Sequence, residues 1–433
     1  MPRPPRETAV PLLFAAFGLL LTPAPALASG FAIFEQGARG MGFAGAYTAV
    51  ASDPSAIFHN AAGIAFLSGR QLYLGGTLIA PSTDFSGADP FPGSAVTEQG
   101  DAGVIIPPAV DYSHQISERL VAGVGIHIPY GLRTRWRNRD TTYTGRFISK
   151  RAELRSISIN PTVAYKIADR LAVGAGVDVR ISTVALERNV GLPNPFTFQV
   201  VDAAAVELES DRSFGLGFNV GVLAKPSRDL SVGAAYRHSV KADFSGSAGF
   251  RLLATGNAQL DAAVGTILPS GAIPVTTAIE FPSLWSFGAA YDWNEWTFAA
   301  GMDLHQWSSF DSLPLQFENR DDLSDVIEEA YQNTRIYRLG VERRLGERWT
   351  VRGGYFYDEN PSPAESVSPL LPDADRHGLA AGVGFQSGRW TVDAANWYLL
   401  FRERSTEGVN RDGYDGTYRS RAELFAVSIG CRF

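Results

Sequence analysis

The sequence predicts an all-β protein: a transmembrane up-and-down antiparallel β-barrel of about fourteen strands, with an N-terminal plug of short helices. Three observations support this fold class. Apolar residues recur with a period of two from residue 70 onward. Short and long connections alternate along the chain. The chain is rich in aromatic residues and glycine, with 26 Phe, 15 Tyr, 8 Trp and 44 Gly, but has no helix-length apolar run beyond residue 30.

The first 28 residues are typical of a cleaved secretory signal peptide. Arg3 and Arg6 precede an apolar run over 10–21, and Ala26-Leu27-Ala28 supplies a small-x-small cleavage site. The whole sequence has a net charge of −7, and the chain without the signal peptide is also mildly acidic. It has no basic stripe that would bind nucleic acid. Its one cysteine, Cys431, cannot form an internal disulfide. We therefore expect an exported protein stabilised by hydrogen bonding and packing.

Alternation such as Trp296, Phe298, Ala300, Met302 and Leu304 indicates strands with two different faces. A soluble β-sandwich would show the same pattern, so the connections decide between the two folds. Tight links near 169, 227, 294 and 388 alternate with long ones over about 81–102, 131–149, 189–211, 247–279, 311–332, 358–374 and 405–418. This sorting is typical of periplasmic turns and extracellular loops, and it predicts a barrel over 70–433 in the bacterial outer membrane.

Residues 29–69 do not alternate and consist mainly of small residues. The segment is predicted to be a plug, or hatch, because a barrel of about fourteen strands is too wide for its own side chains to fill. The hatch candidates are Gly40, Gly42, Asp53, Pro54 and Asn60. The G-x-G-x-x-G spacing over 40–45 lacks the preceding strand that a dinucleotide site needs, so we interpret it as close packing.

No cofactor, metal site or enzymatic activity is predicted. The six histidines are scattered singly, and neither a metal-binding H-E-x-x-H motif nor the G-x-S-x-G motif of a serine hydrolase occurs. A hydrolase site inside the barrel remains an alternative that one sequence does not exclude.

Prolines in predicted strands indicate a weak place in the wall. Proline cannot donate to a β-ladder, and a barrel has no edge strand on which to place it. We expect Pro107 and Pro108 to lie opposite Ile126 and Gly125, with Pro129 in the following strand. These residues predict a lateral gap over Pro107, Pro108, Gly125 and Pro129, unless the prolines simply mark strand ends.

The chain resembles the FadL-type family of outer-membrane transporters for long-chain fatty acids and aromatic hydrocarbons. The resemblance rests on Gly30-Phe31, on Gly40-x-Gly42 and Ala51-x-Asp53-Pro54-Ser55, and on strings beginning at Pro129, Ile159 and Asp373. One departure is that Asn60 is followed by Ala61-Ala62, where the family usually has proline and alanine. The resemblance implies a fourteen-stranded barrel closed by a hatch, a kinked third strand that opens the wall, and ligand capture among the extracellular loops.

These observations lead to a functional hypothesis of passive uptake. Long-chain fatty acids or aromatic hydrocarbons would land on apolar loop residues, and a hatch shift near Phe31 would release them through the lateral gap into the bilayer. The loop candidates are Leu192, Phe196, Phe198, Leu252, Leu253, Leu260, Val264, Ile267 and Leu268. The alternative for these residues is that the loops pack on one another.

A fatty-acid carboxylate would need a cation, and Arg133, Arg135, Arg137 and Arg139 are candidates, although alternate arginines at a barrel rim are more often solvated or bound to lipopolysaccharide phosphate. The predicted partners are these ligands, outer-membrane lipid and lipopolysaccharide. The terminal Phe433 is predicted to be recognised by the barrel-assembly machinery. No nucleic-acid partner is expected, and the protein is expected to be a monomer. A general diffusion porin, a lipid hydrolase, or an adhesin or phage receptor are the alternatives.

Overall fold

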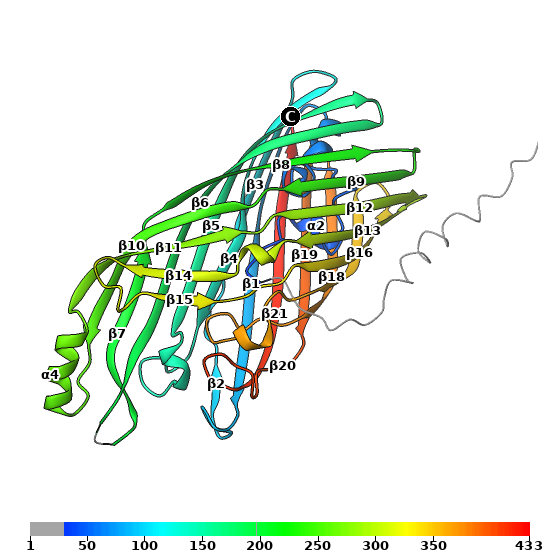
Figure 1. The fold of residues 1–433 in the computed structure, drawn as a ribbon. Coiled ribbons are helices and arrows are strands. Elements are labelled where there is room, and N and C mark those ends of the chain that lie inside the picture. The colour runs from blue at the N-terminus through cyan, green and yellow to red at the C-terminus, as the bar shows by residue number, and fades with distance from the viewer. Residues whose placement is uncertain (1–29, 196) are drawn as a thin grey trace, which may run out of the picture.

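The structure, a computed structural model, describes residues 30–195 and 197–433. It is a long, tilted barrel with a small N-terminal unit inside it (Figure 1). The predicted signal peptide lies outside the described residues. No helix in the described part of the chain is long and apolar enough to cross a membrane.

Fourteen antiparallel strands close the barrel, which confirms the predicted fold class. Each strand pairs with the next, and the last pairs with the first from Gln71↔Arg432 to Gly87↔Gly416. In chain order they are β1 (Arg70–Gly87), β3 (Pro108–Gln115), β4 (Leu120–Arg135), β5 (Arg151–Ala168), β6 (Leu171–Pro193), β8 (Ser213–Ala224), β9 (Leu230–Arg237), β12 (Leu284–Trp293), β13 (Trp296–His305), β16 (Thr334–Leu345), β17 (Trp349–Asp358), β18 (Arg376–Ser387), β19 (Trp390–Phe401) and β21 (Gly416–Arg432).

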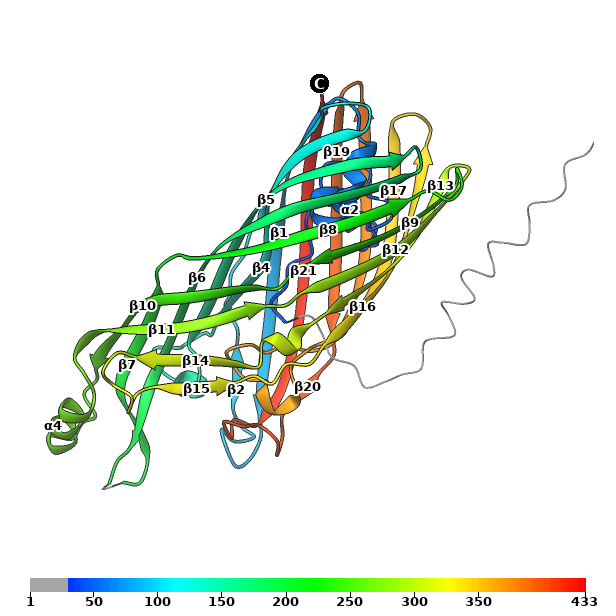
Figure 2. The same ribbon diagram turned by 45° about the horizontal axis from the view of Figure 1, so that its top comes forward.

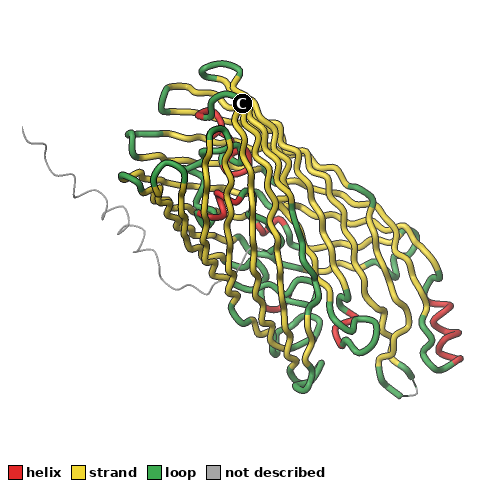
Figure 3. Tube along the Cα trace, turned by 180° about the vertical axis from the view of Figure 1, so that it is seen from behind, coloured by secondary structure: helices red, strands yellow, loops and turns green. Residues whose placement is uncertain are grey.

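Seven further strands of the described chain extend this wall at the end away from the short turns. They are β2 (Thr97–Gln99), β7 (Val200–Ser210), β10 (Val240–Leu252), β11 (Gly271–Phe281), β14 (Ser312–Phe317), β15 (Asp325–Glu328) and β20 (Arg404–Ser405). β7 pairs with β6 and β10, and β10 pairs with β11. The segments 189–211 and 247–279, expected to be loops, are therefore largely strand, with helix α4 (Ala258–Ile267) at the tip of the second (Figure 3). That expectation was wrong because strand pairing continues beyond the apolar band. There the outward residues are mostly charged or polar, so the sequence no longer shows the outward apolar face of a membrane strand.

Alternating burial identifies the two faces of the wall. On β5, the outward residues Ile157, Val163 and Ile167 are exposed, while Ser158 and Asn160 between them are buried against the interior. About ten residues separate Ile157 from Ile167, which matches the height of roughly 25 Å of a transmembrane apolar band. Exposed aromatic residues gather at the end with the short turns: Trp293, Trp349, Trp390 and Phe433. This end faces the periplasm, because bacterial barrels place their short turns there.

The hatch occupies the periplasmic half of the interior (Figure 2). It contains the short helices α2 (Ala38–Gly42), α3 (Ala56–His59) and η1 (Ala61–Phe66), and β1 follows at Arg70. Wall glycines let it approach closely, since a Cβ on any of them would lie 3.0 Å or less from a hatch atom. They come from seven different strands: Gly174, Gly221, Gly233, Gly288, Gly340, Gly354 and Gly382. We call this set the glycine ring; it seats the hatch backbone directly on the wall backbone.

Candidate lateral gap and luminal site

The ladder between β3 and β4 is short. It runs only from Gln115↔Val121 to Val110↔Ile126, although β4 continues to Arg135. On its other side, β4 shifts register against β5 between His127 and Tyr130, around Pro129. Among the described residues, the part of β4 from His127 to Arg135 therefore has no partner on β3. This break lies where the prolines predicted a gap.

The expected register at this break was wrong. Ile126 and Gly125 lie opposite Val110 and Asp111, not opposite Pro107 and Pro108. The ladder is centred on position 118, because the connecting turn is later in the chain than the alternation suggested. Pro108 instead pairs with Gly76 of β1, and Pro107 offers only its carbonyl oxygen, to the Thr77 N–H at 3.1 Å. The two prolines thus end the β3 strand, and Pro129 carries the kink of β4.

The leading segment of the hatch fills the break. Ala32 forms an antiparallel bridge with Tyr130. The Ile33 N–H donates to the Pro129 carbonyl at 2.9 Å, and the Gly131 N–H donates to the Phe31 carbonyl at 3.0 Å. Residues 31–33 therefore take the hydrogen-bonding positions on β4 that β3 leaves vacant.

An aromatic cage surrounds the side chain of Phe31. Its ring lies 4.8 Å from Trp307, 5.2 Å from Phe310, 6.0 Å from Tyr130 and 6.2 Å from Phe281, centroid to centroid, all in edge-on arrangements. Phe31 is buried within the largest apolar cluster of the interior. Such a cage suits an apolar ligand as well as it suits a phenyl ring.

Arg180 is a cation beside this cage that sequence analysis missed. Its guanidinium carbon lies 4.9 Å from the Tyr130 ring and 5.0 Å from the Phe281 ring. Nη2 donates to Asp178 at 2.6 Å, whereas Nε and Nη1 are buried and have no hydrogen-bond partner among the described residues. Two N–H groups therefore remain for an anion. The available signal was a charged residue on the inward face of a membrane strand.

Asp373 holds Gly30, which precedes Phe31 in the leading segment of the hatch. Its Oδ2 accepts from the Gly30 N–H at 2.8 Å, and its Oδ1 accepts from the Ala374 N–H at 2.9 Å. Burial raises the pKa of Asp373 to about 7, and nearby Arg376 opposes this rise only partly. The carboxyl group thus links the leading segment to the extracellular side of the barrel through a titratable contact.

The predicted hatch residues have structural partners. Asp53 accepts from the Tyr47 hydroxyl at 2.7 Å and from the Ser55 hydroxyl at 2.6 Å, and Pro54 is buried beside it. Asn60 donates to the Val222 carbonyl of the wall at 3.0 Å and caps η1 by accepting from Ala62.

The two predicted hatch glycines lie at close approaches. A Cβ on Gly40 would lie 2.9 Å from the His59 ring, and one on Gly42 would lie 2.8 Å from Arg352. The G-x-G-x-x-G spacing accordingly sits inside the hatch, packed against it and against the wall.

Most of the apolar loop candidates pack on one another. Leu192, Leu252, Leu260, Val264 and Leu268 belong to one cluster beneath α4. Leu253 is half-buried, and only Phe198 and Ile267 are exposed, at 88% and 52%. Phe196 lies outside the described residues. The structure thus favours the alternative of loop packing for this set, and the set does not meet Phe31.

Arg133 and Arg135 lie on the outward face. Arg133 pairs with Glu153 across the sheet, and Arg135 pairs with Arg151. On β5, Arg151, Glu153 and Arg155 share the outward face with Ile157. They follow the apolar band toward the extracellular end of the strand. The two arginines therefore stand outside the barrel above the lipid, and the structure does not bring them near the cage.

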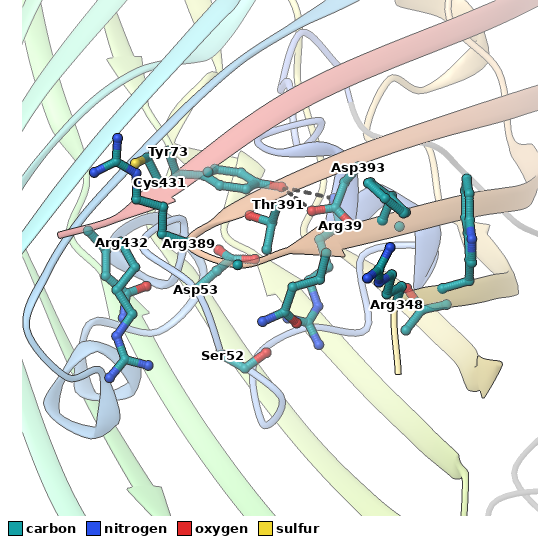
Figure 4. A pocket seen from close by; sticks show the side chains of 18 of the residues that line it. Arg39, Ser52, Asp53, Tyr73, Arg348, Arg389, Thr391, Asp393, Cys431 and Arg432 are labelled. Atoms are coloured by element: carbon teal, nitrogen blue, oxygen red, sulfur yellow. Dashed lines mark hydrogen bonds between the residues drawn. The ribbon is translucent and has the colours of Figure 1, made fainter. Parts of the chain in front are cut away.

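A polar pocket of about 440 Å³ opens at the periplasmic side of the hatch (Figure 4). Arg352 bridges Glu342 at 2.7 Å and Asp393 at 2.6 Å, and Arg39 of the hatch lies 3.4 Å from Glu342. Arg348, Arg389 and Arg432 also line it. This charged lining does not suit an apolar cargo. Among the described residues, no group of three His, Cys, Asp or Glu could hold a metal ion.

Comparison with known proteins agrees with this geometry. A family model described as outer membrane protein transport protein (OMPP1/FadL/TodX) matches residues 19–433. The chain belongs to the FadL/TodX family of outer membrane transport proteins. This family comprises transport proteins rather than enzymes, and its members lie in the outer membrane.

Relatives cover almost the whole chain. The long-chain fatty acid transport protein of Escherichia coli O6:H1 is 24% identical, covering 96% of this chain and 97% of its own length. Outer membrane protein P1 of Haemophilus influenzae is 23% identical, covering 96% and 98%. Among solved FadL/TodX structures, a Pseudomonas aeruginosa FadL homologue has a TM-score of 0.83 at 21% identity, covering 94% of this chain and 100% of its own. The Ralstonia pickettii toluene transporter TbuX has a TM-score of 0.70 at 17% identity, covering 93% and 100%.

Proposed function

We propose that this protein carries long-chain fatty acids passively across the outer membrane and releases them laterally through the break between β3 and β4. The observation that carries the proposal is the backbone pairing of residues 31–33 with β4. A segment whose backbone closes the wall through two hydrogen bonds to β4 can leave when a ligand takes the place of its side chain. Non-helical backbone at membrane depth is tolerated where it lines a cavity, so the opened break is physically permissible.

The ligand competes with Phe31 for the aromatic cage. An acyl chain in the cage gains apolar burial of about 0.8 kcal/mol per methylene, which makes an energy source unnecessary. Loss of Phe31 from the cage withdraws the carbonyl that Gly131 uses, and the adjoining Ile33 contact is strained or lost with it. Ligand binding and opening of the gap are thereby coupled through one segment.

Arg180 favours fatty acids over uncharged hydrocarbons as the main cargo. Its free Nε and Nη1 face a site whose other walls are aromatic, which suits an amphiphile with an anionic head and an apolar chain. Names of relatives include both long-chain fatty acid and toluene transporters. The buried guanidinium is the feature of this chain that supports the proposal of fatty acids.

First capture would use the exposed loop residues Phe198 and Ile267, and the outward arginines would hold lipopolysaccharide phosphate. Arg133 and Arg135 stand with Arg155 above the apolar band, at the height of lipid headgroups. We further propose that the chain acts as a monomer and that Phe433 is read by the barrel-assembly machinery.

A general diffusion porin is the competing function. It would need an aqueous path past the hatch, and the glycine ring seats the hatch on seven strands without a side-chain layer between them. The polar pocket ends at the buried Arg352 network. These contacts argue for a closed periplasmic side and for lateral release.

The deciding experiment replaces Phe31 by Glu. A carboxylate in the cage costs several kcal/mol through desolvation, so the leading segment should be displaced and coupling lost. We expect oleate uptake to fall to the level of cells without the protein, while heat-modifiable migration in gels shows a folded barrel. Val409→Glu is the control and should leave oleate uptake unchanged, because that side chain is 52% exposed in the loop between β20 and β21. Unchanged oleate uptake by Phe31→Glu would contradict the hatch mechanism.

A further inference from the structure

The wall contains a second discontinuity, at the junction of β8 and β10. The β8–β9 ladder ends at Asn219↔Arg237, and the β7–β10 ladder begins at Ser210↔Gly246. Between these ladders, the described chain joins 211–218 to 238–245 by two backbone hydrogen bonds, from the His238 N–H to the Phe218 carbonyl at 2.9 Å and from the Asp211 N–H to the Ser245 carbonyl at 2.8 Å, and no ladder pairs the residues between them. The two stretches nevertheless lie side by side, since a Cβ on Gly215 would be 3.0 Å from the Lys241 carbonyl oxygen.

A mismatch of faces explains the missing ladder. Phe214 and Leu216 point outward on β8, whereas Lys241 and Asp243 point outward on β10. The register of either flanking ladder places Leu216, which points outward, opposite Val240, which points inward. Antiparallel partners must share a face, so these residues cannot pair. Between residues 212–217 and 239–244 the wall is therefore closed by side chains, with one backbone hydrogen bond at each end of the stretch.

Val240 is the side chain that closes it. Val240 is fully buried, and its methyl groups rest on two glycines of β8. A Cβ on Gly217 would lie 2.6 Å from Val240 Cγ2, and a Cβ on Gly215 would clash with Cγ1. Movement of one aliphatic side chain would therefore open the junction without breaking a ladder.

Both sides of Val240 are apolar. Inside, it belongs to the same buried cluster as Phe31 and pairs with Phe281 of the cage wall. Outside, Phe214 and Leu216 are 70% and 73% exposed, compared with 42% for Val220 lower on the same strand. Val240 thus separates the buried cluster of the cage from an unusually exposed apolar lip.

This lip lies within the hydrocarbon of the membrane. Phe214 pairs with Ile181, and Ile181 pairs with Ile157, the last outward apolar residue of β5 before Arg155. The junction is therefore at the outer edge of the apolar band. The nearest outward charges, Lys241 and Asp243, neutralise each other at 3.0 Å.

We propose that the β8–β10 junction is a second lateral opening, gated by Val240, through which uncharged hydrocarbons exchange between the luminal cage and the membrane. It differs from the β3–β4 break in that no backbone hydrogen bond joins its strands to the described residues of the hatch. We assign fatty acids to the first break. This inference rests on the proposed lateral transport function.

A reversible disulfide tests the proposal. In a Cys431→Ser background, Gly217→Cys and Val240→Cys place two thiols across the junction, because a Cβ at 217 already lies 2.6 Å from a Val240 methyl carbon. Uptake of radiolabelled toluene is measured in cells with a complete lipopolysaccharide layer, before and after reduction. We expect the oxidised protein to take up toluene at about half the reduced rate or less, with oleate uptake the same in both states.

The control pair is Val222→Cys with Ala234→Cys, which face each other within the intact β8–β9 ladder, and its oxidation should leave toluene uptake unchanged. Equal toluene uptake by the oxidised and reduced 217/240 protein would overturn the second opening. Where that disulfide does not form, Val240→Gly replaces it and should raise toluene uptake, and an unchanged rate would again overturn the proposal. If the wild type moves neither toluene nor oleate faster than empty cells, the transport function itself fails instead.

Discussion

Replacing Arg180 by Met should weaken the binding of fatty acids selectively. The change removes the guanidinium but keeps an unbranched apolar stem, so the contacts with Tyr130 and Phe281 are largely preserved. Asp178 is not left without a cation, because Arg237 Nη1 lies 3.2 Å from its Oδ2. The variant therefore tests the head-group contact rather than the stability of a buried acid.

The magnitude follows from the two free N–H groups. A hydrogen bond to a charged group contributes about 1.5–3 kcal/mol. Losing that interaction should weaken oleate affinity roughly 10- to 150-fold. Oleyl alcohol, which has the same chain and no charge, should lose almost nothing.

The assay is direct titration of both ligands into purified protein in detergent. Arg133→Met is the matched control, because Arg133 faces outward opposite Glu153, and it should leave both affinities unchanged. Equal losses for oleate and oleyl alcohol would show that the substitution only deforms the cage. Full oleate affinity in the variant would refute the assignment of Arg180 as the head-group partner.

Two further outcomes follow from the hatch and its contacts. Gly354→Val should destabilise the folded barrel by about 1–3 kcal/mol through overpacking, because its Cβ would lie 2.7 Å from Ala44 of the hatch. Gly353→Val is the control and should be neutral, because the nearest atom to its Cβ would be 3.7 Å away. Equal melting temperatures of the two variants would contradict the glycine ring. Burial raises the pKa of Asp373 to about 7, from about 3.9 in the unfolded chain, so the folded state binds this proton more tightly. The free energy of unfolding should therefore fall by up to about 4 kcal/mol through this group as the pH rises from about 4 to 7. Asp373→Asn should abolish that part of the decline in melting temperature between about pH 4 and pH 7, and an identical decline in the variant would exclude the group.

The fold could be predicted from the sequence because barrel strands obey a local rule. The outward residues of β5, such as Ile157 and Val163, alternate with polar inward ones over the full height of the membrane. That rule fails where lipid ends. Beyond Arg155 the outward face meets water, so paired strands such as β7, with Glu207 and Glu209 outward, look like loops.

The site was only partly predictable for a related reason. Proline chemistry is local, and Pro129 therefore indicated the kink of β4 correctly. The closing segment is not local, because Phe31 and Tyr130 are about a hundred positions apart and meet only in the folded barrel. The role of Arg180 depends on Tyr130 and Phe281 from two other strands, which no spacing in the sequence expresses.

The contacts divide the hatch into a fixed body and a replaceable leading segment. Residues 42–62 press on the glycine ring, and Asn60 adds a hydrogen bond to the wall at Val222, so moving the body would disturb seven strands together. Residues 30–33 are held by two backbone hydrogen bonds to β4, one contact to Asp373 and the cage around Phe31. A single amphiphile can replace the last of these, and its binding energy is comparable to what the remaining three contacts supply. Transport therefore requires a local displacement of the leading segment, with the body of the hatch staying in place to keep the periplasmic side closed.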